Sequence, residues 1–139
     1  MEIKTAKARK VVLIQAENNF LDLVEPAQSI TRILNLSEQE KADLRKNFRV
    51  VSDDTHSGEG LVRLLSSICD RYKPEIVIVD PLMAYIGGEI SKQEVCTKFF
   101  RNGINPVIHR YNIGLIVLHH TGKPGSKDLK KICIRNIPL

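Results

Sequence analysis

Three stretches of the chain consist almost entirely of apolar, mostly β-branched or leucine residues, at 10–15 (KVVLIQ), 75–80 (EIVIVD) and 113–120 (IGLIVLHH). Short runs of this kind predict buried strands. The run at 75–80 has no polar alternation, which is typical of a strand buried on both faces of a sheet. A fourth, less apolar run at 48–53 (FRVVSD) predicts one more short strand.

Two helices are predicted between the run at 10–15 and the run at 48–53. Apolar residues recur along 20–36 at three- and four-residue steps, which predicts an amphipathic helix with Pro26 in its first turn or at its start. Ser37 and Glu40 have the spacing of a capping box, so 37–48 is expected to form a short exposed helix. The stripe of the first helix comprises Leu23, Ala27, Ile30 and Leu34.

Two further helices are predicted later in the chain. Residues 60–72 place Leu61, Leu64, Leu65 and Ile68 on one face. A second capping-box spacing, Ser91 with Glu94, predicts a helix over 91–112. Gly103 and Pro106 are expected to break or kink this helix.

Strands that alternate with helices predict an α/β domain with a mostly parallel sheet. In such sheets ligands bind at the carboxyl ends of the strands. Four polar residues directly follow predicted strands and are therefore expected at one edge of the sheet. They are Glu17, Asp80, His119 and His120.

Each of these residues also has a purely structural interpretation. Asp80 before a proline is a common turn former, and Glu17 could open a loop or cap the next helix. Adjacent residues of a strand point to opposite faces, so one of His119 and His120 is expected to be structural. Taken together, the four favour phosphate chemistry, in which a strand-end carboxylate holds magnesium and a second orients the attacking water.

Composition narrows the possible classes of protein. Of the residues, 42% are hydrophobic and 27% charged, and no run approaches the roughly 18 apolar residues of a membrane span. The amino-terminal segment lacks the features of a signal peptide, so we expect a cytoplasmic protein. Three cysteines without C-x-x-C spacing suggest neither disulfides nor zinc. The net charge of +5 is concentrated at both ends, which permits nucleic-acid contact.

Three segments, KVVLIQAEN, PEIVIVDPLMAYIGG and IGLIVLHHTGKP, resemble in that order the ATPase core of the RecA-like superfamily. The similarity is greatest to RepA-type hexameric replicative helicases and related AAA-domain ATPases of phages and plasmids, and it covers about residues 9–124. It implies a three-layer RecA-like core over 1–124, incomplete at its amino-terminal end, followed by a basic tail over 125–139 with room for one short strand.

The resemblance also assigns roles. Glu17 corresponds to the catalytic base, Asp80 to the Walker B aspartate that holds magnesium through water, and His120, or else His119, to the γ-phosphate sensor. It implies Mg-ATP as cofactor, a homo-oligomer such as a hexamer, and single-stranded DNA as partner. The DNA contacts would come from the basic loop after the sensor, at Lys123, Lys127, Lys130 and Lys131.

The chain departs from this family in having no phosphate-binding loop. That motif, G-x-x-x-x-G-K-[ST], supplies backbone N–H groups and a lysine to the phosphates. Only Gly122 precedes a lysine, but Val117 lies five residues earlier and Pro124 follows Lys123. The loop is expected to precede residue 1 in a complete motor. The isolated chain is therefore expected neither to bind ATP tightly nor to hydrolyse it.

Two alternatives remain open from the sequence. One is a degenerate RecA-like interaction module that binds an intact ATPase or DNA without nucleotide turnover. The other is a phosphate-handling enzyme of flavodoxin-like topology with Asp80 as metal ligand, which fits the strands but not the paired histidines. Arg135 is interpreted as a solvated tail residue rather than an arginine finger.

Overall fold

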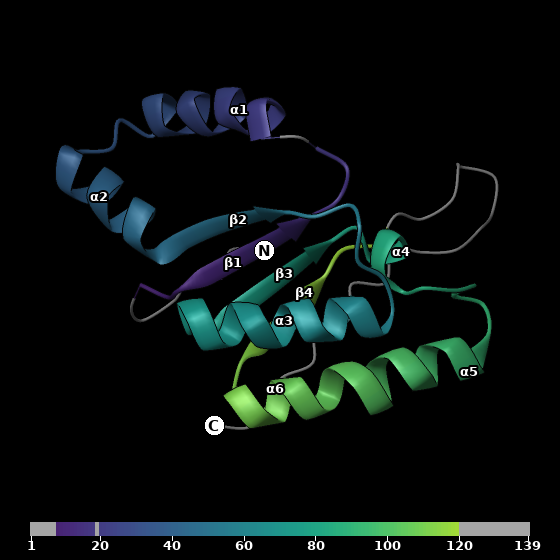
Figure 1. The fold of residues 1–139 in the computed structure, drawn as a ribbon. Coiled ribbons are helices and arrows are strands. Elements are labelled where there is room, and N and C mark those ends of the chain that lie inside the picture. Colours follow the sequence, from purple (N-terminus) through teal and green to yellow (C-terminus); the bar gives the residue numbers. More distant parts are fainter. Residues whose placement is uncertain (1–7, 19, 120–139) are drawn as a thin grey trace, which may run out of the picture.

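The computed structural model describes residues 8–18 and 20–119, and its centre is a parallel β-sheet. Four strands pair side by side in the order β2-β1-β3-β4 (Figure 1). All three pairings are parallel. The predicted α/β class with a parallel sheet is therefore confirmed. The strands are β1 (Val11–Gln15), β2 (Phe48–Ser52), β3 (Ile76–Asp80) and β4 (Gly114–Val117).

Helices connect each strand to the next. Two lie between β1 and β2, one between β2 and β3, and a short turn followed by a long composite helix lies between β3 and β4. Among the described residues, no helix is both long and apolar enough to cross a membrane. The helices are α1 (Phe20–Ile33), α2 (Glu38–Asn47), α3 (Glu59–Tyr72), α4 (Leu82–Tyr85), α5 (Gln93–Cys96), the π-helical segment η1 (Thr97–Ile104) and α6 (Asn105–Tyr111).

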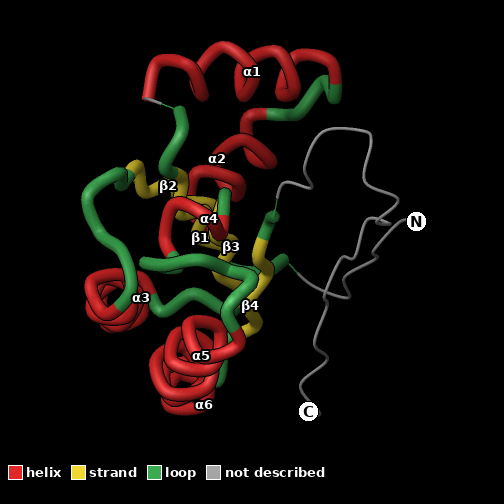
Figure 2. The backbone as a smooth tube through the Cα atoms, turned by 90° about the vertical axis from the view of Figure 1, so that its right-hand side faces the viewer, coloured by secondary structure: helices red, strands yellow, loops and turns green. Residues whose placement is uncertain are grey.

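The hydrophobic core lies on one side of the sheet. Helix α3 and the continuous α5–η1–α6 helix pack against that side, whereas α1 and α2 lie beyond the β2 edge (Figures 1 and 2). The core strand residues alternate along the chain, as expected for one face of a sheet. The central buried side chains are Val12, Ile14, Leu61, Leu65, Ile68, Val77, Val79, Phe99, Ile104 and Val107.

The opposite side of the sheet is only half-buried, which corrects the prediction that the 75–80 strand is buried on both faces. In β3, Val77 and Val79 are buried, but Ile76 and Ile78 are partly exposed. Helices pack on one side only within the described residues, so alternate strand residues remain in contact with solvent. We call this half-buried side the open face.

The two predicted capping boxes have different outcomes. Ser37 accepts a hydrogen bond from the backbone N–H of Glu40, and the Glu40 side chain accepts one from the backbone N–H of Ser37, so the first box is confirmed. The second is wrong because Lys92, not Ser91, is the N-cap residue, and the Ser91 hydroxyl donates to Glu89. The helix begins at Gln93, after Lys92, without a side-chain cap.

The helices also differ from the predictions at Pro26 and around Gly103 and Pro106. Pro26 lies inside α1 rather than in its first turn. The helix predicted over 91–112 passes through Gly103 and Pro106, and the interruption takes the form of π-helical hydrogen bonding in η1. A Cβ atom on Gly103 would lie 2.9 Å from Cγ2 of Val62 in α3, so glycine allows the two helices to approach closely.

Candidate functional site at the carboxyl edge of the sheet

Parallel pairing brings the ends of the four strands to one edge. Gln15 in β1 is the register partner of both Ser52 in β2 and Asp80 in β3. Beyond the strands, the N–H of Ala16 donates to the backbone carbonyl of Asp80 at 3.1 Å. This bond holds the segment that enters Glu17 directly beside Asp80, as the sequence pattern predicted.

The end of β4 joins the same edge. The N–H of Leu118 donates to the carbonyl of Val79 at 2.9 Å, and the carbonyl of Leu118 accepts from the N–H of Leu82 at 2.7 Å. His119 follows immediately and is exposed. Glu17 is also exposed, and Asp80 is half-buried. The structure thus gathers the strand ends that carry Glu17, Asp80 and His119.

The other predicted residues lie outside the described part of the chain. These are the second histidine, His120, and the basic residues Lys123, Lys127, Lys130 and Lys131, together with Arg135. Their predicted roles as sensor and DNA contacts therefore stay predictions, as does the short strand predicted in the tail.

Tyr85 ties the Asp80 turn to the loop after β2. The chain passes from Asp80 through a cis peptide bond to Pro81 and then into α4, which ends at Tyr85. The fully buried Tyr85 hydroxyl donates to the carbonyl of Asp53 at 2.6 Å, and the Tyr85 carbonyl accepts from the N–H of Gly58 at 2.8 Å. Burial, reinforced by the negative charges of Asp53, Asp54 and Asp80, raises the pKa of Tyr85, so the phenol remains a donor.

The sequence did not predict an Asp–His pair in this loop. Oδ1 of Asp53 lies 2.7 Å from Nδ1 of His56 and accepts from the Thr55 hydroxyl at 2.9 Å. Burial of the Asp53 carboxyl opposes ionisation, but the hydrogen bonds from His56 and Thr55 outweigh it and lower the pKa of Asp53. The only sequence signal was an aspartate three residues before a histidine in a polar loop, which is too common to single out.

Two buried oxygen atoms at this edge lack hydrogen-bond partners within the described residues. They are Oε1 of Gln15 and Oδ2 of Asp53. Gln15 is 4% exposed, so its amide oxygen is shielded from water. An unpaired buried acceptor costs about 1–3 kcal/mol. In native proteins such an acceptor calls for an explanation, such as a bound water or ion or a catalytic role.

Asp80 is the candidate magnesium ligand at this edge. The described residues contain no group of three or more His, Cys, Asp or Glu side chains close enough to hold a metal ion. Mg²⁺ commonly keeps several waters and takes only one or two carboxylates together with substrate phosphates. Asp80 could hold a magnesium ion in that way, directly or through water, and no all-protein cage is required.

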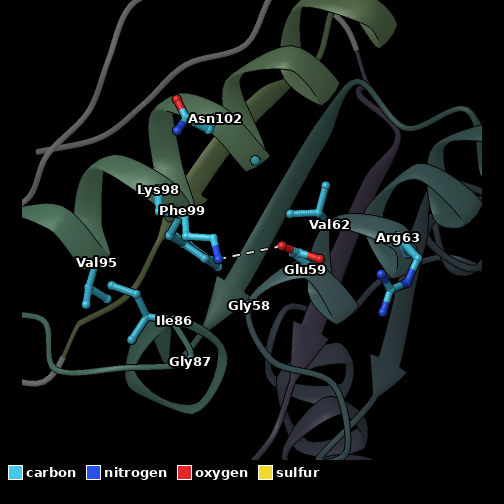
Figure 3. Close-up of a pocket in the computed structure, with 11 residues that line it drawn as sticks. Gly58, Glu59, Val62, Arg63, Ile86, Gly87, Val95, Lys98, Phe99 and Asn102 are labelled. Atoms are coloured by element: carbon cyan, nitrogen blue, oxygen red, sulfur yellow. Dashed lines mark ion pairs between the residues drawn. The ribbon is translucent and has the colours of Figure 1, made fainter.

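A separate cleft of about 450 Å³ lies between α3 and η1 (Figure 3). Its apolar wall includes Val62 and Phe99, and an ion pair between Lys98 and Glu59 at 3.7 Å crosses its rim. Both charged side chains are 74% exposed, so the pair contributes at most about 1 kcal/mol. None of the residues predicted as site residues lines this cleft.

Comparison with known proteins adds no assignment, since no family model and no curated protein matches the chain.

Proposed function

We propose that the chain is part of an ATP-dependent DNA motor of the RecA-like type. The observation that carries the proposal is the pairing of β1 with β3, which sets the segment leading to Glu17 beside Asp80 at the carboxyl edge. Two carboxylates at the ends of adjacent strands, one in β3 and one just beyond β1, suit a reaction in which one holds magnesium and the other orients water.

In this proposal each residue has a defined task. Asp80 holds Mg²⁺ through its carboxylate or a bound water, and Glu17 accepts a hydrogen bond from the attacking water. His120, or His119, responds to the γ-phosphate. Lys123, Lys127, Lys130 and Lys131 contact the phosphates of single-stranded DNA. The bound Mg-ATP would supply the phosphoryl group that is transferred to water.

The hydrogen bonds of Tyr85 support a proposal that a ligand bound at Asp80 affects the loop after β2. Asp80 is joined to α4 through Pro81, and Tyr85 at the end of α4 is hydrogen-bonded to Asp53 and to Gly58, the N-cap of α3. These hydrogen bonds of 2.6 and 2.8 Å, made by the fully buried Tyr85, hold the Asp80 turn and the loop after β2 together. A ligand at Asp80 therefore has a physical route to the loop that follows β2.

The chain has no glycine loop to surround the phosphates. We therefore expect the purified chain to bind Mg-ATP weakly at best and to release no phosphate, but to retain single-stranded DNA binding. Fluorescence anisotropy with a labelled oligonucleotide measures that binding. Changing Lys123 and Lys127 to Glu should weaken it and reduce its salt dependence. Lys41→Glu combined with Lys46→Glu, in α2, is the matched control. Absence of DNA binding by the folded chain would contradict the motor proposal.

The open face favours a second candidate, an interaction module that binds an intact ATPase or DNA without nucleotide turnover. Apolar residues left half-exposed over a sheet commonly mark a protein contact. Stoichiometric co-purification with an intact ATPase, without any Mg²⁺ effect at Asp80, would favour this candidate over the motor.

A further inference from the structure

Strand β4 forms one edge of the sheet, and no other strand pairs with its outer side within the described residues (Figure 1). The N–H groups of Gly114 and Leu118 donate to carbonyls on the β3 side, at 2.8 and 2.9 Å. Backbone groups alternate in direction along a strand, so those of Leu115 and Val117 point away from β3. An unpaired row of N–H and C=O groups of this kind can pair with an added strand.

An apolar groove of about 600 Å³ lies beside this edge, between β4 and the α5–η1–α6 helix. Leu115 and Val117 line it, because register places both on the core face of the sheet beside Val77 and Val79. Its apolar side chains pack against the core but are only half-buried. They are Cys96, Phe100, Ile108, Leu115 and Val117. Apolar side chains that entered the groove would continue the core past β4.

The carboxyl-terminal segment of the chain starts at this edge and is long enough to return along it. The described residues end at His119, two residues after β4, and residues 120–139 lie outside them. Within that segment, 131–137 (KICIRNI) has the composition of a short strand. Residues 120–130 connect it to His119 and span up to about 36 Å when extended. The four residues of β4 cover only about 13 Å.

The side-chain pattern of 131–137 fits the groove. In a strand, Ile132 and Ile134 share one face, with the same two-residue spacing as the β4 side chains that line the groove. The opposite face carries the charged Lys131 and Arg135. Charged side chains on an outermost strand hinder pairing with yet another strand. The segment thus has one apolar face for the groove and one charged face, as an edge strand requires.

We propose that residues 131–137 add to the sheet as a strand antiparallel to β4, with Ile132 and Ile134 in the groove. An antiparallel neighbour can be reached through a loop, whereas a parallel one needs a crossover connection, usually a helix. Gly122 and Pro124 make a helix unfavourable in the connection. Hydrogen-bonded pairs face each other in an antiparallel ladder, so the same two β4 residues supply both the backbone bonds and the apolar contacts.

The docking does not depend on the proposed ATPase function, because it uses neither Asp80 nor Glu17. It has a consequence for that function, however. The loop 120–130 would begin and end at the carboxyl edge, so Lys123 and Lys127 would be held near the turn that carries Asp80. Only this consequence rests on the proposed function, and the docking itself is tested without nucleotide or DNA.

Amide hydrogen exchange of the full chain, followed by NMR, tests the docking. Amides that bond to an added strand exchange slowly, so those of Leu115 and Val117 should be protected. Ile132→Lys should speed their exchange by about tenfold or more, because it brings a lysine into an apolar groove. Cys133→Lys, on the opposite face of the segment, is the matched control and should leave the exchange unchanged. Central β3 amides, such as that of Val79, report that each variant is folded.

A cross-link within one chain tests the orientation of the segment. Cys96 lines the groove. In a chain that carries Ile132→Cys and Cys133→Ser, a short bis-maleimide should therefore join positions 96 and 132. The wild-type chain is the control, because its Cys133 points away from the groove and should stay unlinked to Cys96. A link between two chains would show that a second copy supplies the strand, and this would overturn the inference.

Three results of the exchange experiment would also contradict the docking. One is fast exchange of the Leu115 and Val117 amides in the wild type, and another is protection that survives Ile132→Lys. The third is protection that Ile3→Lys abolishes while Ile132→Lys keeps it, since the amino-terminal residues 1–7 would then occupy the edge.

Discussion

The two sides of the sheet carry side chains of the same type but have different neighbours. Val77 and Val79 lie under α3 and the α5–η1–α6 helix, whereas Ile76 and Ile78, one residue away, lie on the open face. Apolar content alone therefore does not decide burial. What decides it is which helices the connections place on each side, and this difference predicts how substitutions on the two sides should behave.

The largest expected difference is in the free energy of unfolding lost when a buried or an exposed leucine is changed to alanine. Leu65 in α3 is completely buried, so Leu65→Ala should lower the free energy of unfolding by about 2–5 kcal/mol. Leu44 in α2 is 44% exposed, and Leu44→Ala should change the free energy of unfolding by only about 0.5 kcal/mol. Urea unfolding monitored by circular dichroism measures both. Equal effects would mean that the core is not on the α3 side.

The next effect concerns the close approach of α3 and η1. Gly103→Ala adds a methyl group 2.9 Å from the stiff Val62 side chain and should cost about 1–3 kcal/mol of stability. Val62→Ala in the same protein should recover part of that loss. Gly60→Ala, which meets the His56 ring at an acceptable 3.4 Å, should be neutral or stabilising. A neutral Gly103→Ala would contradict the close packing of these helices.

The hydrogen bond that joins the Asp80 turn to the β2 loop gives a smaller effect. Tyr85→Phe leaves the carbonyl of Asp53 without this donor and should cost about 1–2 kcal/mol. Tyr111→Phe is the control, because its hydroxyl donates to Asp70 at the exposed surface. Thermal unfolding measures the difference. A larger loss for Tyr111→Phe than for Tyr85→Phe would argue against a tight link at the edge.

The smallest expected effect is on the pH dependence of stability. The pKa of Asp53 is lower in the folded protein than its ordinary value of 3.8. Its stabilising contribution is thus complete above the unfolded pKa and is lost as the pH falls through the folded pKa. Asp53→Asn should flatten the acid limb below about pH 4. If the stability of the variant falls with pH as steeply as that of the wild type below about pH 4, the hydrogen bonds from His56 and Thr55 to Asp53 are not the cause of the acid dependence.

The sequence predicts some of these features well because their causes are local. Apolar runs and the Ser37 capping box depend on neighbouring residues, and the four strands and this cap were found where predicted. The 113–120 prediction was too long, because β4 ends at Val117, before His119, and its residues are half-buried or exposed rather than buried. The Ser91 capping box failed because the helix begins at Gln93 with Lys92 as its N-cap, which leaves Ser91 outside the cap position. The open face could not be predicted, since its exposure depends on where α1 lies in space. The Asp53–His56 pair and the role of Tyr85 depend on contacts between loops, for which the sequence carries no periodic signal.

The central claim is that Asp80, at the carboxyl edge of the sheet, holds a divalent cation. It is tested most directly by adding Mn²⁺ to the isotopically labelled chain and measuring paramagnetic broadening of its amide resonances. If Asp80 holds a divalent cation there, broadening should centre on the ends of β1 and β3 and on the Asp80 turn. Asp80→Asn should abolish it, whereas Asp54→Asn, which changes the same charge nearby, should leave it in place. Broadening that is centred elsewhere, or that survives Asp80→Asn, would contradict the assignment of Asp80 as the metal-holding residue.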